Sequence, residues 1–108
     1  MAVNFILKKY TEREIRIVIQ DQDKYTLPNL LTKLALRKPG VTFAGYIIEH
    51  PMVSYPEVVI VTDGTKNPME ILEEVIAEAK AIAIKFLETL DMVLKNAAKE
   101  RNTNIAHQ

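Results

Sequence analysis

The stretch that decides the fold runs from Asn67 to Lys99 and reads NPMEILEEVIAEAKAIAIKFLETLDMVLKNAAK. Asn67 is a suitable helix cap, Pro68 suits the first helical position, and Glu70 is placed to reach back to the cap. No glycine or proline follows up to Gln108. The pattern therefore predicts one amphipathic helix that begins at Asn67 and continues to about Lys99.

Eleven apolar side chains of this helix lie on one side. They are Leu72, Val75, Ile76, Ala79, Ile82, Ala83, Phe86, Leu87, Leu90, Val93 and Leu94. At 100° per residue they span an arc of roughly 140°, which is wider than the ~100° stripe of a helix that faces a core. The helix would be about 45 Å long, whereas strands of six to eight residues span only about 20 to 27 Å. The sheet of this chain is too short to cover the far turns.

Large side chains at the far turns therefore lack a cover within this chain. Phe86, Leu90, Val93 and Leu94 would each forgo about 1.5 to 3 kcal/mol of burial in water. An exposed apolar stripe of this kind usually marks an association site. Fraying of the last turns, or a break near Met92 that folds the helix back, is the alternative interpretation. We expect a partner.

The composition narrows the class of protein. A chain of 108 residues suits one domain. Its 14 basic and 14 acidic residues balance, so it lacks the basic field typical of nucleic-acid binding, and only a small cluster of Lys33, Arg37 and Lys38 is basic. The chain contains no cysteine, so disulfides and thiolate sites are excluded. Without a signal-peptide pattern or a membrane-length apolar run, we expect a soluble cytoplasmic protein.

Two strands are expected at the start of the chain. Val3–Lys9 and Glu14–Gln20 are strand-like, and the polar residues 10–13 between them form a turn, which predicts a hairpin. In the second strand isoleucine occupies every second position, at Ile15, Ile17 and Ile19. This alternation predicts one strongly apolar face.

A short helix follows. Thr26 is expected to cap it, and Pro28 fits its first turn because that turn needs no amide donor there. Apolar residues recur at helical spacing at Leu27, Leu30, Leu31, Leu34 and Ala35. We expect the helix to run to Arg37, where Pro39 and Gly40 stop it.

Two more strands precede the long helix. Val41–Glu49 is strand-like, with Gly45 as a bulge or a point of close approach. Glu57–Thr62 carries four consecutive aliphatic residues, which is typical of an inner strand, and Asp63 and Gly64 then form a turn. The order is ββαββα. It predicts an α+β fold with a four-stranded antiparallel or mixed sheet and two helices on one face. We expect one domain over residues 1–99 and a mobile tail over residues 100–108.

Residues that carry chemistry are sparse. His50 and His107 are the only imidazoles, too few for a site with three or four metal ligands. Ser54 is the only serine and has no base beside it, and the glycines are too scattered to form a phosphate-binding loop. We therefore expect no catalytic residue, no cofactor and no metal.

Several short motifs follow one another along the chain. They are Thr26-Leu27 with Asn29-Leu30-Leu31, Pro39-Gly40-Val41 with Phe43-Ala44-Gly45-Tyr46, His50-Pro51, and Thr62-Asp63-Gly64 with Pro68. Together with the long apolar helix they resemble the family of archaeal RNA polymerase subunit L and its eukaryotic small-subunit counterparts. The resemblance covers about Glu14 to Leu94. Tyr25 and Pro28 stand where the family often has His and Gly, and Met52 where it commonly has Leu.

This resemblance implies a non-catalytic subunit with an alpha-subunit-like dimerisation fold. It implies a heterodimer with the larger alpha-like polymerase subunit, which is designated D in archaea. That heterodimer serves as the platform on which the catalytic subunits of a DNA-directed RNA polymerase assemble. The implied interface uses both helices of each partner. In this chain the candidate interface residues are Leu27, Leu30, Leu31, Leu34, Ile82, Phe86, Leu90, Val93 and Leu94.

Two other functions compete with this interpretation. One is a stand-alone homodimer that binds a small ligand or transfers a proton, which requires convergent titratable groups. The other is a single-stranded RNA binder that stacks bases on Tyr10, Phe43, Tyr46 or Tyr55 across an open sheet face. That function requires basic residues interleaved with the aromatics on one strand face, and only Lys8 and Arg16 offer themselves there. Because the net charge is zero, we expect only weak nucleic-acid binding.

Overall fold

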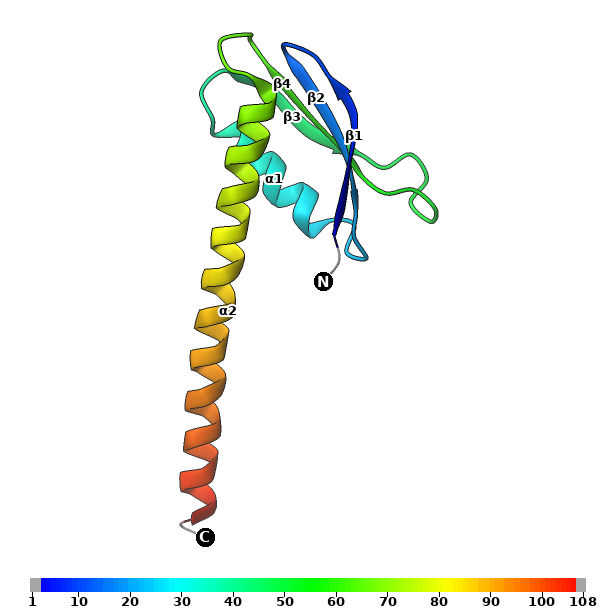
Figure 1. Ribbon diagram of the computed structural model, residues 1–108. Coiled ribbons are helices and arrows are strands. Elements are labelled where there is room, and N and C mark those ends of the chain that lie inside the picture. The colour runs from blue at the N-terminus through cyan, green and yellow to red at the C-terminus, as the bar shows by residue number, and fades with distance from the viewer. Residues whose placement is uncertain (1–2, 107–108) are drawn as a thin grey trace. The chain divides into compact units, whose positions relative to one another are not determined.

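The computed structural model describes residues 3–106 and has the element order ββαββα (Figure 1). The chain divides into two units, one up to Glu78 and one from Ala79 onward. The first unit holds all four strands, the first helix and the start of the second helix. The elements are β1 (Asn4–Tyr10), β2 (Glu14–Gln20), α1 (Thr26–Leu36), β3 (Val41–Ile47), β4 (Glu57–Thr62) and α2 (Pro68–Ala106).

The four strands form one sheet in the order β1-β2-β4-β3, and every neighbouring pair is antiparallel. The sheet is therefore antiparallel rather than mixed. β4 lies between β2 and β3, which confirms the prediction of an inner strand from its run of aliphatic residues. The register places Ile17 of β2 opposite Val58 of β4, and Ile15 opposite Ile60.

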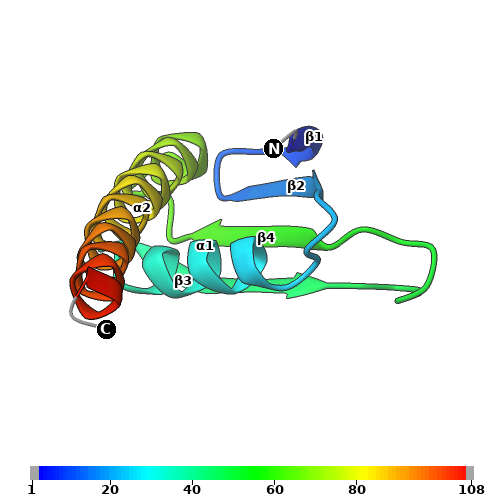
Figure 2. The same cartoon turned by 90° about the horizontal axis from the view of Figure 1, so that it is seen from below.

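The hydrophobic core lies on one face of this sheet. Residues that pair across antiparallel strands point to the same face, so the predicted isoleucine face of β2 joins Val58 and Ile60. α1 covers β3 and β4 on this side (Figure 2). The first turns of α2 add their own buried side chains to the first unit. The core of that unit contains Ile15, Ile17, Ile19, Leu31, Leu34, Ala35, Val58, Ile60, Ile71, Leu72 and Val75.

The start of α1 differs from the prediction that Thr26 caps it. Thr26 is already helical, and Tyr25 occupies the cap position without a side-chain cap. The Asp23 carboxylate instead accepts hydrogen bonds from the N–H groups of Tyr25 and Thr26, at 3.0 and 3.1 Å, and from the Thr26 hydroxyl. The hydrogen bond from the Thr26 hydroxyl is the main reason that the pKa of Asp23 is lowered. The Thr26 hydroxyl therefore serves as a donor to the residue that organises this turn.

β3 ends at Ile47, two residues before the predicted end, and its irregularity lies between Val41 and Phe43 rather than at Gly45. Of the two alternatives predicted for Gly45, the structure shows the close approach and not the bulge, because a Cβ added at Gly45 would lie 3.0 Å from Cζ of Phe43. The Phe43 ring extends over the glycine two positions along its own strand.

The start of α2 agrees with the sequence. Asn67 Oδ1 accepts the N–H of Met69 at 2.8 Å, and Pro68 is the first helical residue. Gly64, with φ of +93°, provides the turn expected before the helix. The helix continues past Lys99 to Ala106. Residues 107–108 lie outside the described residues, and the mobility expected for residues 100–108 stays a prediction.

Candidate protein-interaction surface

The second unit presents an apolar face along α2, which we call the far face. It consists of the five predicted partner residues of this helix, Ile82, Phe86, Leu90, Val93 and Leu94. Their side chains are between 41% and 66% exposed. A single helix cannot bury its own apolar side, so these residues can be covered only by something outside this unit.

Two polar contacts of the same segment join residues one helical turn apart. Lys95 Nζ lies 2.9 Å from Asp91 Oδ2, one turn away, and the Thr89 hydroxyl donates to the Lys85 carbonyl oxygen at 2.9 Å. The ion pair supports the helix by a few tenths of a kcal/mol at most. They leave the far face apolar. Met92 is also exposed, but at 100° per residue it lies opposite Leu90.

The four predicted partner residues of α1 do not share one environment. Leu31 is completely buried and Leu34 is 8% exposed, so both belong to the core of the first unit. Leu27 and Leu30 are half-buried. α1 has a single apolar stripe, and the sheet already occupies its centre. Only Leu27 and Leu30 therefore offer apolar surface from the predicted α1 residues.

One exposed leucine of α1 lies outside the predicted interface residues. Leu36 is 56% exposed at the last position of this helix. It lies outside the stripe that predicted Leu27, Leu30, Leu31 and Leu34. The spacing in the sequence could have indicated this exposure, because a leucine that does not follow the core spacing of a short helix faces away from the core.

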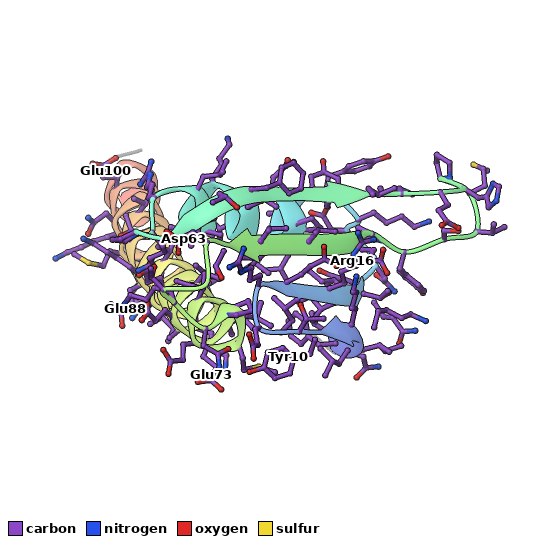
Figure 3. The ribbon with its side chains drawn as sticks, turned by 90° about the horizontal axis from the view of Figure 1, so that it is seen from above. Tyr10, Arg16, Asp63, Glu73, Glu88 and Glu100 are labelled. Atoms are coloured by element: carbon purple, nitrogen blue, oxygen red, sulfur yellow. The ribbon has the colours of Figure 1, made fainter. Side chains whose placement is uncertain are left out.

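The open face of the sheet, away from α1, carries an ion-pair network around Arg16 (Figure 3). Arg16 Nε lies 3.0 Å from Glu14 Oε2, and its Nη1 lies 3.6 Å from Glu57 Oε2. Lys9 Nζ contacts the same Glu14 oxygen at 2.9 Å. Hydrogen bonds from Lys9 and then Arg16 lower the pKa of Glu14. The charge of Arg16 is therefore engaged by carboxylates of this chain.

A hollow of about 410 Å³ lies on this open face. Ile6, Lys8, Val18, Gln20, Ile47, Glu49, Ser54, Tyr55 and Glu57 line it. Apolar side chains and both signs of charge mix in this lining.

The four aromatics proposed for RNA stacking do not lie on one face. Tyr10 pairs with Ile15 and Tyr46 pairs with Val58, so both point to the core side of the sheet. Phe43 pairs with Val61 on the open face, and Tyr55 lines the hollow. Stacking on single strands requires aromatics beside available cations on one surface. On the open face Tyr55 lies beside cations, because Lys8 lines the same hollow and Lys24 Nζ lies 5.6 Å from the Tyr55 ring centroid. Tyr10 and Tyr46 lie on the other face, so the four aromatics do not form one stacking surface.

His50 is exposed in the loop between β3 and β4. Within residues 3–106 no group of three or more His, Cys, Asp or Glu side chains is placed to hold a metal ion. Across the same residues neither helix combines the length and the apolar character needed to cross a membrane.

Comparison of the sequence with known proteins identifies a matching family and several relatives. Residues 14–89 match the family described as RNA polymerase Rpb3/Rpb11 dimerisation domain. DNA-directed RNA polymerase subunit Rpo11 of Methanocaldococcus jannaschii is 32% identical over 83% of this chain and 92% of its own length. The subunit Rpo11 of Pyrococcus furiosus is 33% identical over 89% of this chain and its whole length.

A solved structure shows the same fold. The crystal structure of DNA-directed RNA polymerase subunit L from Thermoplasma acidophilum superposes with a TM-score of 0.68. The match covers 89% of this chain and 93% of that chain, at 14% sequence identity. At this identity the likeness is evidence for the fold alone.

Proposed function

Because this chain belongs to the family of RNA polymerase Rpb3/Rpb11 dimerisation domains, we propose that it pairs with the larger, Rpb3-like subunit of the same polymerase, the one designated D in archaea. The chain is a dimerisation subunit of a DNA-directed RNA polymerase and is not itself catalytic. The heterodimer then acts as a platform for assembly of the catalytic subunits in the cytoplasm. Contact with nucleic acid is left to other subunits.

The observation that carries this proposal is the exposed far face of α2. Ile82 and Phe86 fall within the residues that match the family, and Leu90, Val93 and Leu94 extend the same side of the helix beyond them. The helix already covers part of each of these side chains, so burial of the part that is still exposed contributes on the order of 5 kcal/mol before the costs of association are subtracted. The far face is therefore proposed as the main apolar contribution to the heterodimer, to which other contacts add.

We propose that α1 contributes less apolar surface to this interface than α2 does. Leu27 and Leu30 have apolar surface left to offer, whereas Leu31 and Leu34 act indirectly by holding α1 on the sheet. The partner is therefore expected to pack mainly on α2, with α1 at the edge of the contact.

Substitution on two opposite sides of α2 tests the proposal. Leu90→Asp places a carboxylate on the far face, where an unpaired charge excluded from water is strongly disfavoured. Met92→Asp introduces the same charge two residues later on the opposite side. Each variant is co-expressed with the Rpb3-like subunit of the same organism, and recovery of the complex is measured. We expect Leu90→Asp to abolish recovery and Met92→Asp to retain it.

A third variant separates association from folding. Ile17 is 4% exposed in the core, so Ile17→Asp should unfold the isolated chain, as followed by circular dichroism. Leu90→Asp should leave the spectrum of the isolated chain close to that of wild type. Recovery of an intact complex with Leu90→Asp would contradict the proposed interface. Formation of a stable homodimer without the Rpb3-like subunit would favour the competing homodimer function.

A further inference from the structure

We propose that Lys38 is a positioning residue for partner binding, because it clamps the last turn of α2 that belongs to the first unit. The inference rests on the proposed function of the far face. We call residues 68–78, the part of α2 inside the first unit, the root of α2.

Lys38 reaches the root from the end of α1. Its backbone N–H donates to the Ala35 carbonyl oxygen at 3.0 Å, so its position is set by the helix end. Its side chain is only 21% exposed, and its Nζ contacts Glu78 Oε1 and lies 3.6 Å from Glu74 Oε2. The two carboxylates are one helical turn apart. One ammonium group therefore bridges the last two turns of the root.

The two carboxylates stabilise the charged form of Lys38. The hydrogen bond to Glu78 is the main cause of a raised pKa of Lys38, and it outweighs the effect of partial burial. Glu74 adds attraction in the same direction. Isolated exposed ion pairs contribute little to stability. Lys38 differs from such pairs because it is partly desolvated and shared by two acids.

The backbone beside Lys38 is held against the turn that leads into the root. The Gly40 carbonyl oxygen accepts the N–H of Asp63 at 2.8 Å. A Cβ added at Gly40 would lie 3.0 Å from Oγ1 of Thr65 and 3.2 Å from Cγ of Lys66. Residues 38–40 therefore contact the turn before the root through the backbone of Gly40, and the end of the root through the Lys38 side chain.

The position of Glu78 gives this clamp a functional consequence. Glu78 is the last residue of the first unit, and Ile82, the first residue of the far face, follows one turn later. The buried side chains Ile71, Leu72 and Val75 anchor earlier turns of the root. A helical turn ordered in the free chain does not have to be ordered during association, so it lowers the entropic cost of binding. Lys38 supplies this order next to the interface.

The test compares two lysines of the full chain in binding to the Rpb3-like subunit. Lys38→Met keeps the aliphatic stem and removes the charge, and we expect Kd to rise about three- to tenfold. Lys38→Arg keeps the charge and should restore most of the affinity. Lys95→Met, the matched control, removes an exposed pair within one helix and should change Kd by less than about twofold.

Hydrogen exchange of the free chain provides a second measurement. In Lys38→Met, amides of residues 79–86 should exchange faster, while amides of β2 should keep wild-type protection. If Lys38→Met instead makes the amides of β2 exchange faster, the variant has disturbed the fold. Glu78→Gln then provides the test, because it removes the partner carboxylate and leaves Lys38 in place. The charge-swapped pair Lys38→Glu with Glu78→Lys should recover both affinity and protection.

The outcomes separate the two proposals. If the wild-type chain binds, and both Lys38→Met and Glu78→Gln keep the wild-type Kd and the wild-type hydrogen exchange, the role of Lys38 is overturned. The proposed function is then unaffected. Failure of the wild-type chain to bind its Rpb3-like subunit would overturn the proposed function, and the positioning role with it. A loss of affinity equal to that of Lys95→Met would also contradict a special role for Lys38.

Discussion

Tyr10 and Asn67 join the first strand to the start of the last helix. The Tyr10 hydroxyl donates a 2.8 Å hydrogen bond to Asn67 Oδ1, across 57 positions of sequence. The same oxygen accepts the N–H of Met69 at 2.8 Å. Figure 3 shows Tyr10 at the end of β1, beside the start of α2. One side-chain oxygen thus caps α2 and connects it to the sheet.

Removal of this shared oxygen should cost more than removal of its tyrosine donor. Asn67→Ala loses the cap, and we expect the free energy of unfolding to fall by about 1 kcal/mol. Tyr10→Phe loses one exposed hydrogen bond and should cost about 0.5 kcal/mol. Urea unfolding followed by circular dichroism measures both. The double variant should lose less than the sum, and strictly additive losses would argue against coupling.

Alanine at Gly40 should destabilise the first unit more than alanine at Gly64. Both glycines have positive φ, +85° and +93°, which costs roughly 1 to 2 kcal/mol for a residue with a Cβ. At Gly64 the nearest atom belongs to the flexible Arg13 side chain, at 3.1 Å. At Gly40 it is Thr65 Oγ1, which is hydrogen-bonded to Asp63 and cannot move freely. Equal losses in thermal unfolding would contradict this distinction.

Truncation should separate the core from the far face in the isolated chain. Ile17→Ala removes a buried side chain and should lower the free energy of unfolding by about 2 to 5 kcal/mol. Leu90→Ala removes an exposed one and should change it by at most about 0.5 kcal/mol. Denaturant unfolding of each variant checks the difference. A large loss for Leu90→Ala would mean that the chain buries Leu90 by itself.

The turn before α1 should contribute a pH-dependent stability. The pKa of Asp23 is lowered in the folded chain, chiefly by the Thr26 hydroxyl. A lowered carboxyl pKa stabilises the fold above the unfolded value, which is about 4, and this stability is lost as pH falls through the folded pKa. Asp23→Ala should therefore be less stable than wild type at neutral pH, with a difference that shrinks near pH 3. A pH-independent difference in urea midpoint would contradict this assignment.

Free DNA should bind weakly and without sequence preference. The net charge is zero and Arg16 is engaged by Glu14 and Glu57, so few phosphates can be neutralised at once. Filter binding at roughly physiological salt with single-stranded and duplex DNA measures this affinity. A sub-micromolar Kd would be inconsistent with the expectation.

Local sequence patterns predicted an element well where the pattern lay within one strand or within one or two helical turns. The alternation of Ile15, Ile17 and Ile19 predicted the buried face of β2, and four aliphatic residues predicted that β4 is an inner strand. The cap of α1 was missed because Thr26 and Asp23 are both suitable capping residues, and the local pattern did not distinguish them.

One part of the candidate interface could also be predicted from local sequence patterns, and the other part could not. The far face of α2 follows from periodicity alone, since a helix too long for its sheet must leave apolar side chains uncovered. The surface of α1 does not follow, because four leucines at helical spacing look alike in sequence. Burial of Leu31 and Leu34, with Leu27 and Leu30 half-buried, depends on how α1 lies against β3 and β4.

By itself, the sequence determined the order of the elements, the cap of α2 at Asn67 and the length of its apolar side, because these depend on spacings within one element. Only the tertiary structure decided which distant groups meet. The contacts of Tyr10 with Asn67 and of Lys38 with Glu74 and Glu78 span 57, 36 and 40 positions. They depend on the strand order and on the packing of both helices, which bring residues together that no local periodicity relates.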